Sequence, residues 1–514
     1  MNVSHRLVEI LEENGIEHVF GIPGDQILPL YEALSNSTIK HILTKHEQAA
    51  AHAADAYSRV SSNIGVCIAT AGPGALNLVM GVAAAYKDSI PILVITGDND
   101  LSVRDKNYFQ SFPLRDIFEN ITVESYSPLN GTEAIYALKA SLYALKNDPK
   151  GPIHINLSKD VLLSEEFTDF DLCYLCEADL SAIDEAQKFI NNSKKTLFVL
   201  GSGAISQAEE IKLISKEYNI PITTTYNGRG IISEEDDLNL GMLGIRSTPQ
   251  ALKAIGEADS VIALGSIASN RTFPNLDENK LIHVNIDKKV LKGKYQIQGT
   301  VKDFLLNIDF KKQDWISDIL SINNERYFEG VDDDLTPQAA IKRILNKFRD
   351  DIIVADAGSH TTWVSLMHKA LKPNTLLFPA ATAPMGYGLP AAIGASLGSD
   401  KQIIAINGDG DFQMNLQELA TLKENNLDVI VFILNNSEYG IIRQWQEDFY
   451  EMKPYQVNLN NPDFLKLSAA YGIDSVRINN LSDLEYFLDS NLKGPLLVEV
   501  LVDKQNIPLP NTKN

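Results

Sequence analysis

One unit near residue 400 joins two buried strands through a helix, and it restricts the chain to folds with parallel sheets. The apolar run Ile403–Ile406 ends at Gly408-Asp409-Gly410. A helix predicted over Leu416–Glu424 then leads to a second apolar run, Val429–Leu434, and to Asn435-Asn436. Because such a connection makes the two strands parallel neighbours, we expect Asp409 and Asn436 at one edge of the sheet. A carboxylate and an amide oxygen there suit Mg²⁺ holding a diphosphate, with backbone N–H groups of the glycine turn facing the anion.

Short apolar runs alternate with helical patterns along almost the whole chain. This pattern predicts an α/β fold with three doubly wound domains and mainly parallel sheets, over residues 1–162, 180–308 and 335–510. Two acidic stretches without periodicity, 163–179 and 323–334, are predicted linkers. The predicted strands are His18–Phe20, His41–Thr44, Gly65–Thr70, Ile92–Thr96 and His154–Leu157 in the first block, Thr196–Leu200, Ile220–Thr225, Ser260–Leu264 and Leu281–Ile286 in the second, and Ile352–Ala355, Leu376–Phe378, Ile403–Ile406, Val429–Leu434 and Leu496–Val500 in the third.

Composition and charge exclude several classes of protein. The net charge of −22 disfavours nucleic acid or an anionic membrane as a partner. No stretch of about 18 apolar residues predicts a membrane span, and the first twenty residues predict an amphipathic helix leading to a strand, so we expect a cytoplasmic protein. Three cysteines do not make a disulfide framework, and the single C-x-x-C of Cys173 and Cys176 is interpreted as two linker thiols.

The strand–GDG–helix–strand–NN unit resembles the metal–diphosphate motif of enzymes that use thiamine diphosphate (ThDP). ThDP needs a carboxylate against N1′ of its aminopyrimidine, so that this ring can take the proton from C2 of the thiazolium. Glu47, which follows the predicted strand His41–Thr44 and begins an Ala-rich helix, meets that need. Alternatively, Glu47 is an ordinary first-turn residue favoured by the helix dipole.

Two glycine turns follow predicted strands of the first block: Phe20–Asp25 and Thr70–Asn77. Either turn alone is typical of a plain loop. Because ligands of open α/β sheets collect at the carboxyl ends of strands, the two turns together predict backbone walls around the reacting carbon.

From about residue 3 to residue 503 the chain resembles the acetolactate synthase (acetohydroxyacid synthase) catalytic-subunit family of ThDP enzymes. The resemblance rests on VFGIPGDQILPLYEAL, KHEQAAAHAADAYSR, PMGYGLPAAIGA, GDGDFQMNLQELAT and IIRQWQEDFY. It implies that the cofactor lies between the first block of one subunit and the third block of another. A homodimer is then the minimum unit, with a tetramer and a small regulatory subunit left open.

The resemblance also implies roles for individual residues. Glu47 would be the proton-relay carboxylate, with Gly24, Phe109 and Gln110 as further catalytic residues. Mg²⁺ would be bound by Asp409, Asn436 and the backbone carbonyl of Glu438. The diphosphate would be held by Gly358, Ser359, His360 and Gly410, where the family usually has Gln in place of Ser359. Met385 would bend the cofactor, and Ala383 would offer its carbonyl to the aminopyrimidine. The remaining expected cofactor contacts are Gly72, Asn77, Gly408, Asp411, Tyr439 and Gly440.

Two residues are expected at the acceptor substrate. Arg271 matches an arginine that binds the acceptor's carboxylate, a task for which a guanidinium fork is well shaped. Trp445 matches a tryptophan that lines the acceptor pocket. The alternatives are a surface arginine and the core tryptophan of an amphipathic helix.

The middle block departs from the family in the stretches expected to contact FAD. The family's G-M-H-G appears as Gly244-Ile245-Arg246-Ser247, and its R-F-D-D-R appears as Ile267-Ala268-Ser269-Asn270-Arg271. These changes leave FAD, and with it the identity of the acceptor, open.

The resemblance implies a ThDP- and Mg²⁺-dependent carboligase. It would decarboxylate pyruvate and join the two-carbon unit to a second 2-keto acid, giving 2-acetolactate or 2-aceto-2-hydroxybutyrate. The alternatives are a decarboxylase that releases an aldehyde, a carboligase with another acceptor, and a homologue that merely binds the cofactor.

Overall fold

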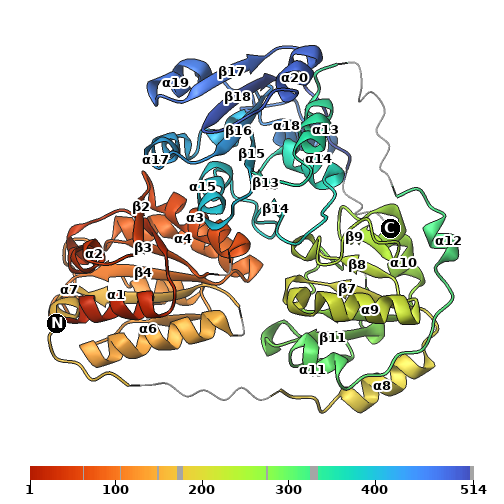
Figure 1. Cartoon of the computed structure of the whole chain (residues 1–514), viewed down its shortest axis with the longest axis horizontal. Coiled ribbons are helices and arrows are strands. Elements are labelled where there is room, and N and C mark those ends of the chain that lie inside the picture. The colour runs from red at the N-terminus through yellow and green to blue at the C-terminus, as the bar shows by residue number, and fades with distance from the viewer. Residues whose placement is uncertain are drawn as a thin grey trace. The chain divides into compact units, whose positions relative to one another are not determined.

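The computed structural model describes residues 1–61, 63–104, 106–147, 150–170, 178–273, 276–324 and 334–509. It contains three six-stranded sheets, and the described strand registers are all parallel (Figure 1). The predicted α/β fold with three parallel sheets is therefore confirmed. The chain divides into two compact units: unit 1 comprises residues 1–173, 331–365 and 377–507, and unit 2 comprises residues 174–330, 366–376 and 508–514.

The first sheet belongs to unit 1 and has the strand order β2-β1-β3-β4-β6-β5. Its order reverses between β1 and β3, whose carboxyl ends carry the two glycine turns. The strands are β1 (His18–Gly21), β2 (Lys40–Leu43), β3 (Gly65–Ala69), β4 (Ile92–Asp98), β5 (Glu124–Tyr126) and β6 (Ile153–Ser158), and the helices are α1 (Val3–Glu13), α2 (Leu28–Ser35), α3 (Glu47–Val60), α4 (Pro73–Asp88), α5 (Leu114–Glu119), α6 (Gly131–Lys146) and α7 (Lys159–Leu163).

The second sheet belongs to unit 2 and has the order β12-β11-β10-β7-β8-β9, which reverses between β7 and β10. Its strands are β7 (Thr196–Leu200), β8 (Ile222–Thr224), β9 (Asn239–Met242), β10 (Ser260–Leu264), β11 (Leu281–Asn285) and β12 (Tyr295–Gln298), and the helices of this part are α8 (Ile183–Asn192), α9 (Ala208–Tyr218), α10 (Pro249–Glu257), α11 (Val301–Leu305) and α12 (Ser317–Leu320).

The third sheet repeats the order of the first as β14-β13-β15-β16-β18-β17 and reverses between β13 and β15. Asp409 follows β15 at this point. The strands are β13 (Ile352–Ala355), β14 (Leu376–Leu377), β15 (Ile403–Gly408), β16 (Val429–Asn435), β17 (Asp474–Ile478) and β18 (Leu496–Leu501), and the helices are α13 (Pro337–Lys347), α14 (Ser359–Met367), α15 (Gly388–Gly398), α16 (Asp409–Phe412), α17 (Leu419–Glu424), α18 (Gly440–Asp448), α19 (Phe464–Ala470) and α20 (Leu481–Leu488).

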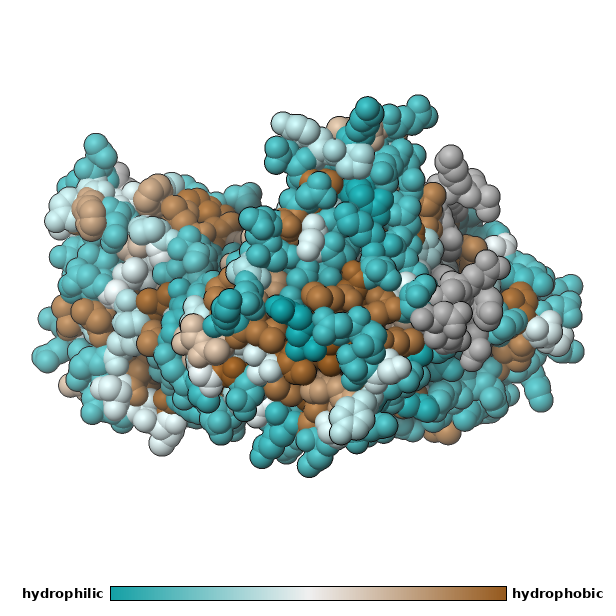
Figure 2. All heavy atoms as spheres, turned by 90° about the horizontal axis from the view of Figure 1, so that it is seen from above, coloured by the Kyte–Doolittle hydropathy of each residue, from teal (hydrophilic) through white to brown (hydrophobic). Residues whose placement is uncertain are grey.

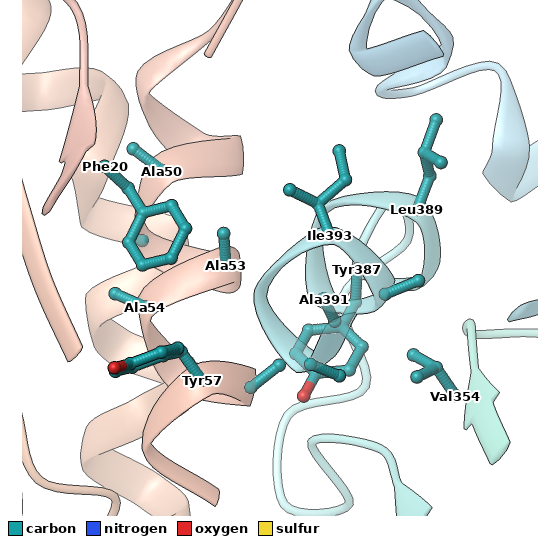
Figure 3. Close-up of a cluster of buried hydrophobic side chains, with 14 of the residues drawn as sticks. Phe20, Ala50, Ala53, Ala54, Tyr57, Val354, Tyr387, Leu389, Ala391 and Ile393 are labelled. Carbon is teal, nitrogen blue, oxygen red and sulfur yellow. The ribbon is translucent and has the colours of Figure 1, made fainter. Parts of the chain in front are cut away.

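Helix α3 is the centre of unit 1 and packs against β3, α4 and α15. Its sequence EQAAAHAADAYSRV is alanine-rich, and small side chains let neighbouring backbones approach closely. A Cβ added to Gly394 of α15 would lie 2.0 Å from the carbonyl oxygen of Ala53, and one added to Gly65 of β3 would lie 2.0 Å from that of Ala54. Figure 3 shows Ala53 on the side of α3 that faces α15. Glycine is therefore required on both sides of α3.

A buried charge network crosses the same contact. Arg59 of α3 donates to Asp55 (2.7 Å) and to Asp88 at the end of α4 (2.9 Å). The Tyr387 hydroxyl, directly before α15, donates to Asp55 at 2.9 Å, and the Ala381 N–H donates to Asp88 at 3.3 Å. Since a buried charge is costly without partners, this network fixes how α3, α4 and the segment before α15 meet.

Each predicted strand coincides with an observed one, with ends that shift by no more than two residues. The predicted helix over Leu416–Glu424 forms as a 3₁₀ turn followed by α17. Four strands were not predicted: β5, β9, β12 and β17. All four lie at sheet edges, where a strand has one partner and needs fewer apolar residues.

Cys173 and Cys176 lie outside the described residues, as does most of the predicted linker at 323–334. Within the described ranges, no helix is both long enough and apolar enough to cross a membrane.

We expect Gly394→Ala to lower the free energy of unfolding of unit 1 by about 3 kcal/mol, because the added methyl group meets the backbone of α3 rather than a movable side chain. Gly256 in α10 has no atom within 4 Å of an added Cβ. Gly256→Ala is therefore the matched control and should stabilise its helix by about 0.5–1 kcal/mol. Urea unfolding followed by circular dichroism measures both, and equal effects would contradict the close packing of α15 on α3.

Candidate active site

The carboxyl ends of β1 and β3 bring the two glycine turns of the first sheet together. A Cβ added to Gly24 would lie 2.5 Å from the Thr70 Cβ, so the first turn rests directly on the start of the second. Gly72 has φ +62°, a backbone conformation that favours glycine, and α4 begins directly after it. The turns therefore form one surface of close-packed backbone.

Glu47 lies beside this surface, in the first turn of α3. Its carboxylate accepts a hydrogen bond from Asn77 Nδ2 at 2.9 Å. A Cβ added to Gly74 would lie 3.2 Å from Glu47 Oε1, and one added to Gly72 would lie 2.8 Å from Gln110 Cβ. The structure thus brings the predicted residues Glu47, Gly72, Asn77 and Gln110 together, while the neighbouring Phe109 side chain is 75% exposed.

Asp409 follows β15 and is only 2% exposed. Asn461 donates to Asp409 Oδ2 at 2.6 Å and to the side-chain oxygen of Asn435, at the end of β16, at 3.0 Å. Burial raises the pKa of Asp409 to about 6. A nearby divalent cation would offset this burial and keep the carboxylate ionised.

Asn436 lies close to Gly440 and Ser359. A Cβ added to Gly440 would lie 3.3 Å from Asn436 Nδ2 and 3.4 Å from Ser359 Oγ. Tyr439 packs against Gly410, where an added Cβ would lie 2.5 Å from the Tyr439 ring. The ends of β15 and β16 therefore gather the residues predicted for the diphosphate.

The Glu438 side chain is buried, and its carboxylate is paired with Arg443 at 2.9 Å and Lys504 at 2.7 Å. These two cations leave the backbone carbonyl, rather than the carboxylate, for a metal ion. Asp409, Asn436 and that carbonyl would make an all-oxygen donor set, which suits Mg²⁺. No group of three His, Cys, Asp or Glu side chains that would suit a transition metal occurs in the described part of the chain.

The other side of the proposed metal site is lined by four residues: Gly358, His360, Gly408 and Asp411. Asp411 accepts the Gly408 N–H at 2.9 Å, and a Cβ added to Gly358 would lie 2.6 Å from His360 Nδ1. Burial lowers the pKa of His360 to about 4, so the ring is neutral at pH 7. Its Nε2 has no hydrogen-bond partner among the described residues, which fits an anionic ligand.

The segment with Ala383 and Met385 is held by Asp356, a residue that we did not predict. The Asp356 carboxylate accepts the N–H groups of Gly386 (2.9 Å) and Gly388 (2.7 Å). Ala383 has φ +49°. Asp356 directly follows a predicted strand, and this position was the sequence signal for it. Asn461 lies in a loop without such a signal.

Trp445 lies on α18 of unit 1 with its side chain 40% exposed. Arg271 is exposed and lies in unit 2. Its carbonyl accepts the Ile245 N–H at 2.9 Å, so the stretches 244–247 and 267–271 adjoin each other.

Glycines at the switch point of the second sheet pack against each other. Gly203 N–H donates to the Gly265 carbonyl at 3.0 Å, and a Cβ added to Gly201 would lie 2.3 Å from the same oxygen. This contact between two turns is enough to explain why glycines occur here, and no bound ligand is needed to explain them.

Models of three protein domains match the chain. The N-terminal TPP binding domain of thiamine pyrophosphate (ThDP) enzymes matches residues 1–118, their central domain matches 183–308, and their C-terminal TPP binding domain matches 356–500. The three matches fall on the three sheets in the same order.

Curated relatives align over nearly the whole chain. The acetolactate synthase large subunit of Lactococcus lactis subsp. lactis is 34% identical, with 99% of this chain and 93% of the relative covered. The proteins of the same name from Cyanidium caldarium and Porphyra purpurea are 34% and 36% identical, each covering 96% of this chain and 92% and 91% of the relative.

Glu418, in the turn before α17, holds the segment that leads to Glu47, because its carboxylate accepts the Lys45 N–H at 2.9 Å. Burial raises the pKa of Glu418 to about 7. A raised folded-state pKa stabilises the protein fully below the unfolded-state value, and this contribution is lost as the pH rises through 7. We therefore expect Glu418→Gln to gain about 2–3 kcal/mol relative to the wild type between pH 4.5 and pH 8.

Urea unfolding at several pH values measures this difference. Glu424→Gln is the matched control, since Glu424 lies on α17 and pairs with Lys45 at the surface. It should change the stability by less than about 0.5 kcal/mol at each pH. Parallel pH curves for Glu418→Gln and the wild type would contradict the assignment.

Proposed function

Because the chain belongs to the acetolactate synthase large-subunit family of thiamine pyrophosphate enzymes, we propose that it decarboxylates pyruvate and joins the two-carbon unit to a second 2-keto acid. The products would be 2-acetolactate from pyruvate and 2-aceto-2-hydroxybutyrate from 2-ketobutyrate. The observation that carries the proposal is the pair of switch points in unit 1: one gathers Glu47, Asn77 and Gln110, and the other gathers buried Asp409, Asn436 and His360. The domain division at 1–162, 180–308 and 335–510 is part of the proposal.

Thiamine diphosphate, when bound, supplies the nucleophilic carbon and the electron sink for the reaction. Asp409, Asn436 and the Glu438 carbonyl would hold Mg²⁺. Gly358, Ser359, His360, Gly408, Gly410 and Asp411, with Tyr439 and Gly440, would hold the diphosphate. Ser359 Oγ and His360 Nε2, which has no hydrogen-bond partner in the part of the chain that the structure describes, support this assignment because both are polar atoms beside the proposed metal ligands.

Glu47 would hold a proton at N1′ of the aminopyrimidine. Asn77 supports this role because its N–H fixes the carboxylate through one oxygen and leaves the other next to Gly74. Gly24 and Gly72 would form backbone walls that exclude water near the reacting carbon. Ala383 and Met385 would orient the ring, with Asp356 holding their segment.

The acceptor is the less defined substrate. Arg271 would bind its carboxylate and Trp445 would line its pocket, with Phe109 and Gln110 near the reacting carbon. The chemistry requires no redox step, so FAD is not needed for it.

We propose a homodimer as the active unit, with a tetramer as a larger form. Figure 2 shows apolar patches on the surface, and unit 1 exposes large apolar side chains that a second copy would cover, among them Leu28, Leu43, Met80 and Met414. The relatives are named large subunits, which supports a small regulatory subunit as a further partner. We propose the cytoplasm as the location of the reaction.

The test is product analysis with the purified protein, ThDP, Mg²⁺ and pyruvate, with and without 2-ketobutyrate and FAD. We expect acetolactate from pyruvate alone and the mixed product with 2-ketobutyrate. Acetaldehyde alone would show a decarboxylase, and unconsumed pyruvate would show another keto acid as substrate. If the rate of product formation differs between the assays with and without FAD, the reaction needs FAD.

Glu47→Gln and Asp409→Ala should fail in different ways. Glu47→Gln should lower turnover at least about 100-fold while ThDP still binds, because only proton transfer is lost. Asp409→Ala should raise the Kd of ThDP about 100-fold, or about 2.7 kcal/mol. Glu133→Gln, in the first turn of α6, is the control and should change neither quantity.

Turnover assays and calorimetric titration with ThDP and Mg²⁺ separate these effects. Retained turnover in Glu47→Gln would remove Glu47 from its role. Unchanged ThDP affinity in Asp409→Ala would exclude the metal site.

A further inference from the structure

A chain of buried polar side chains runs across β4 and β6 of the first sheet. Thr96 Oγ1 lies 2.8 Å from both His154 Nε2 and Asn156 Oδ1. Asn156 Nδ2 donates to Asp98 Oδ2 at 2.6 Å, and Ser125 Oγ lies 2.9 Å from His154 Nδ1. Thr96, Asp98, His154 and Asn156 are all buried.

These residues share one face of the sheet, because Thr96 pairs with Asn156 and side chains two apart on a strand point the same way. Leu93, Ile95, Ile153 and Ile155 on the opposite face belong to an apolar core. On the polar face, the Phe118 ring of α5 stacks on His154 with ring centres 4.1 Å apart. On this face the polar side chains therefore link β4 to β6 through hydrogen bonds in addition to their packing.

The hydrogen bonds have one consistent direction. The Asp98 carboxylate accepts from the Asn156 amide, which turns the Asn156 oxygen toward the Thr96 hydroxyl. Since Thr96 donates there, it accepts from His154 Nε2–H. His154 Nδ1 then faces the Ser125 hydroxyl, which also lies 3.2 Å from the Arg115 carbonyl. Burial lowers the pKa of His154 to about 3, so the ring is neutral as this arrangement requires. The donors of His154, Thr96 and Asn156 therefore point toward Asp98.

Asp98 connects this series of polar side chains to the loop that ends at Gln110. The structure describes the loop except for residue 105. Asp98 Oδ1 accepts the Asn99 N–H at 2.8 Å, and the Asn99 side chain donates to the Phe109 carbonyl at 3.0 Å. Asn99 thereby closes the loop at its base. Gln110, the next residue, has φ +58° and packs on Gly72.

Three further contacts hold the flank of the loop. Arg104 donates to Ser127 Oγ at 2.9 Å and to Ser158 Oγ at 3.3 Å, and the Leu101 N–H donates to Asp160 at 3.0 Å. These contacts are made by other residues than Phe109 and Gln110. Asn99, which directly follows β4, bonds the end of the loop itself.

We propose that Asn99 is a positioning residue that sets Phe109 and Gln110 against the Gly72 turn, and that the series of hydrogen bonds from His154 to Asp98 fixes Asn99 in place. The inference rests on the proposed function, in which Phe109 and Gln110 act near the reacting carbon. Asn99 itself touches no reacting atom and acts through the loop.

The test compares the full-length Asn99→Ala variant with Asn120→Ala. Asn120 also donates its amide to a backbone carbonyl, that of Asp116 at 2.8 Å, but at the exposed end of α5. Both variants lose one hydrogen bond to a carbonyl, and only Asn99→Ala frees the loop.

The rate of trypsin cleavage reports on how firmly the loop is held and does not depend on enzyme activity, because Lys106 is an exposed residue of the loop. We expect Asn99→Ala to be cleaved after Lys106 about tenfold faster than the wild type, and Asn120→Ala to be cleaved at the wild-type rate. With ThDP and Mg²⁺, kcat/KM for pyruvate should fall about tenfold in Asn99→Ala while the Kd of ThDP is unchanged.

A second variant, Thr96→Val, interrupts the chain and leaves Asn99 in place. It should also speed cleavage after Lys106, by a smaller factor than Asn99→Ala. Wild-type cleavage in Asn99→Ala, or equal loss of kcat/KM in Asn120→Ala, would overturn the inference. A wild type that forms no acetolactate would contradict the proposed function alone, because the cleavage rates still decide whether Asn99 holds the loop.

Discussion

The contact between α3 and α15 is the constraint on which unit 1 depends. Ala53 and Gly394 bring two backbones together at a distance that leaves no room for a methyl group. Arg59 of α3 pairs with Asp55 of the same helix and with Asp88 of α4, and Tyr387, directly before α15, donates to Asp55. Helix α3 begins with Glu47, and α15 follows the segment with Ala383 and Met385. The same contact therefore fixes the first and third sheets and the segments that carry the proposed chemistry.

Buried charged side chains have different roles at two places in unit 1. The Asp55–Arg59–Asp88 network is complete within the protein and defines one packing arrangement at the cost of desolvating three charges. Around Asp409 the balance is incomplete: the carboxylate is buried, its pKa is raised to about 6, and Asn461 is a neutral partner. An incomplete balance of this kind is typical of a ligand site, where a cation supplies the missing partner.

The sequence was sufficient to predict an element where its residue pattern fits only one kind of local structure. Central strands such as β15 and β16 are apolar on both faces and were predicted to within two residues. Edge strands such as β5 and β17 have one partner and weak patterns, and they were missed. In the candidate site, glycine turns and residues beside them, including Glu47 and Asp409, could be found from local sequence. Asp356 and Asn461 act on segments far away in the chain, and a single sequence does not reveal such pairings.

The pairing of Glu438 with Arg443 has a consequence for how this protein can diverge. Arg443 lies on α18, two residues before Trp445, so the helix with the proposed pocket tryptophan is tied to the loop with the proposed metal ligands. Mutations on α18 that adapt the pocket would also disturb metal affinity, and selection would remove many of them. The stretches around Arg246 and Arg271 belong to unit 2 and lie outside α18. Substitutions on α18 would therefore change the proposed acceptor pocket and the proposed metal loop together.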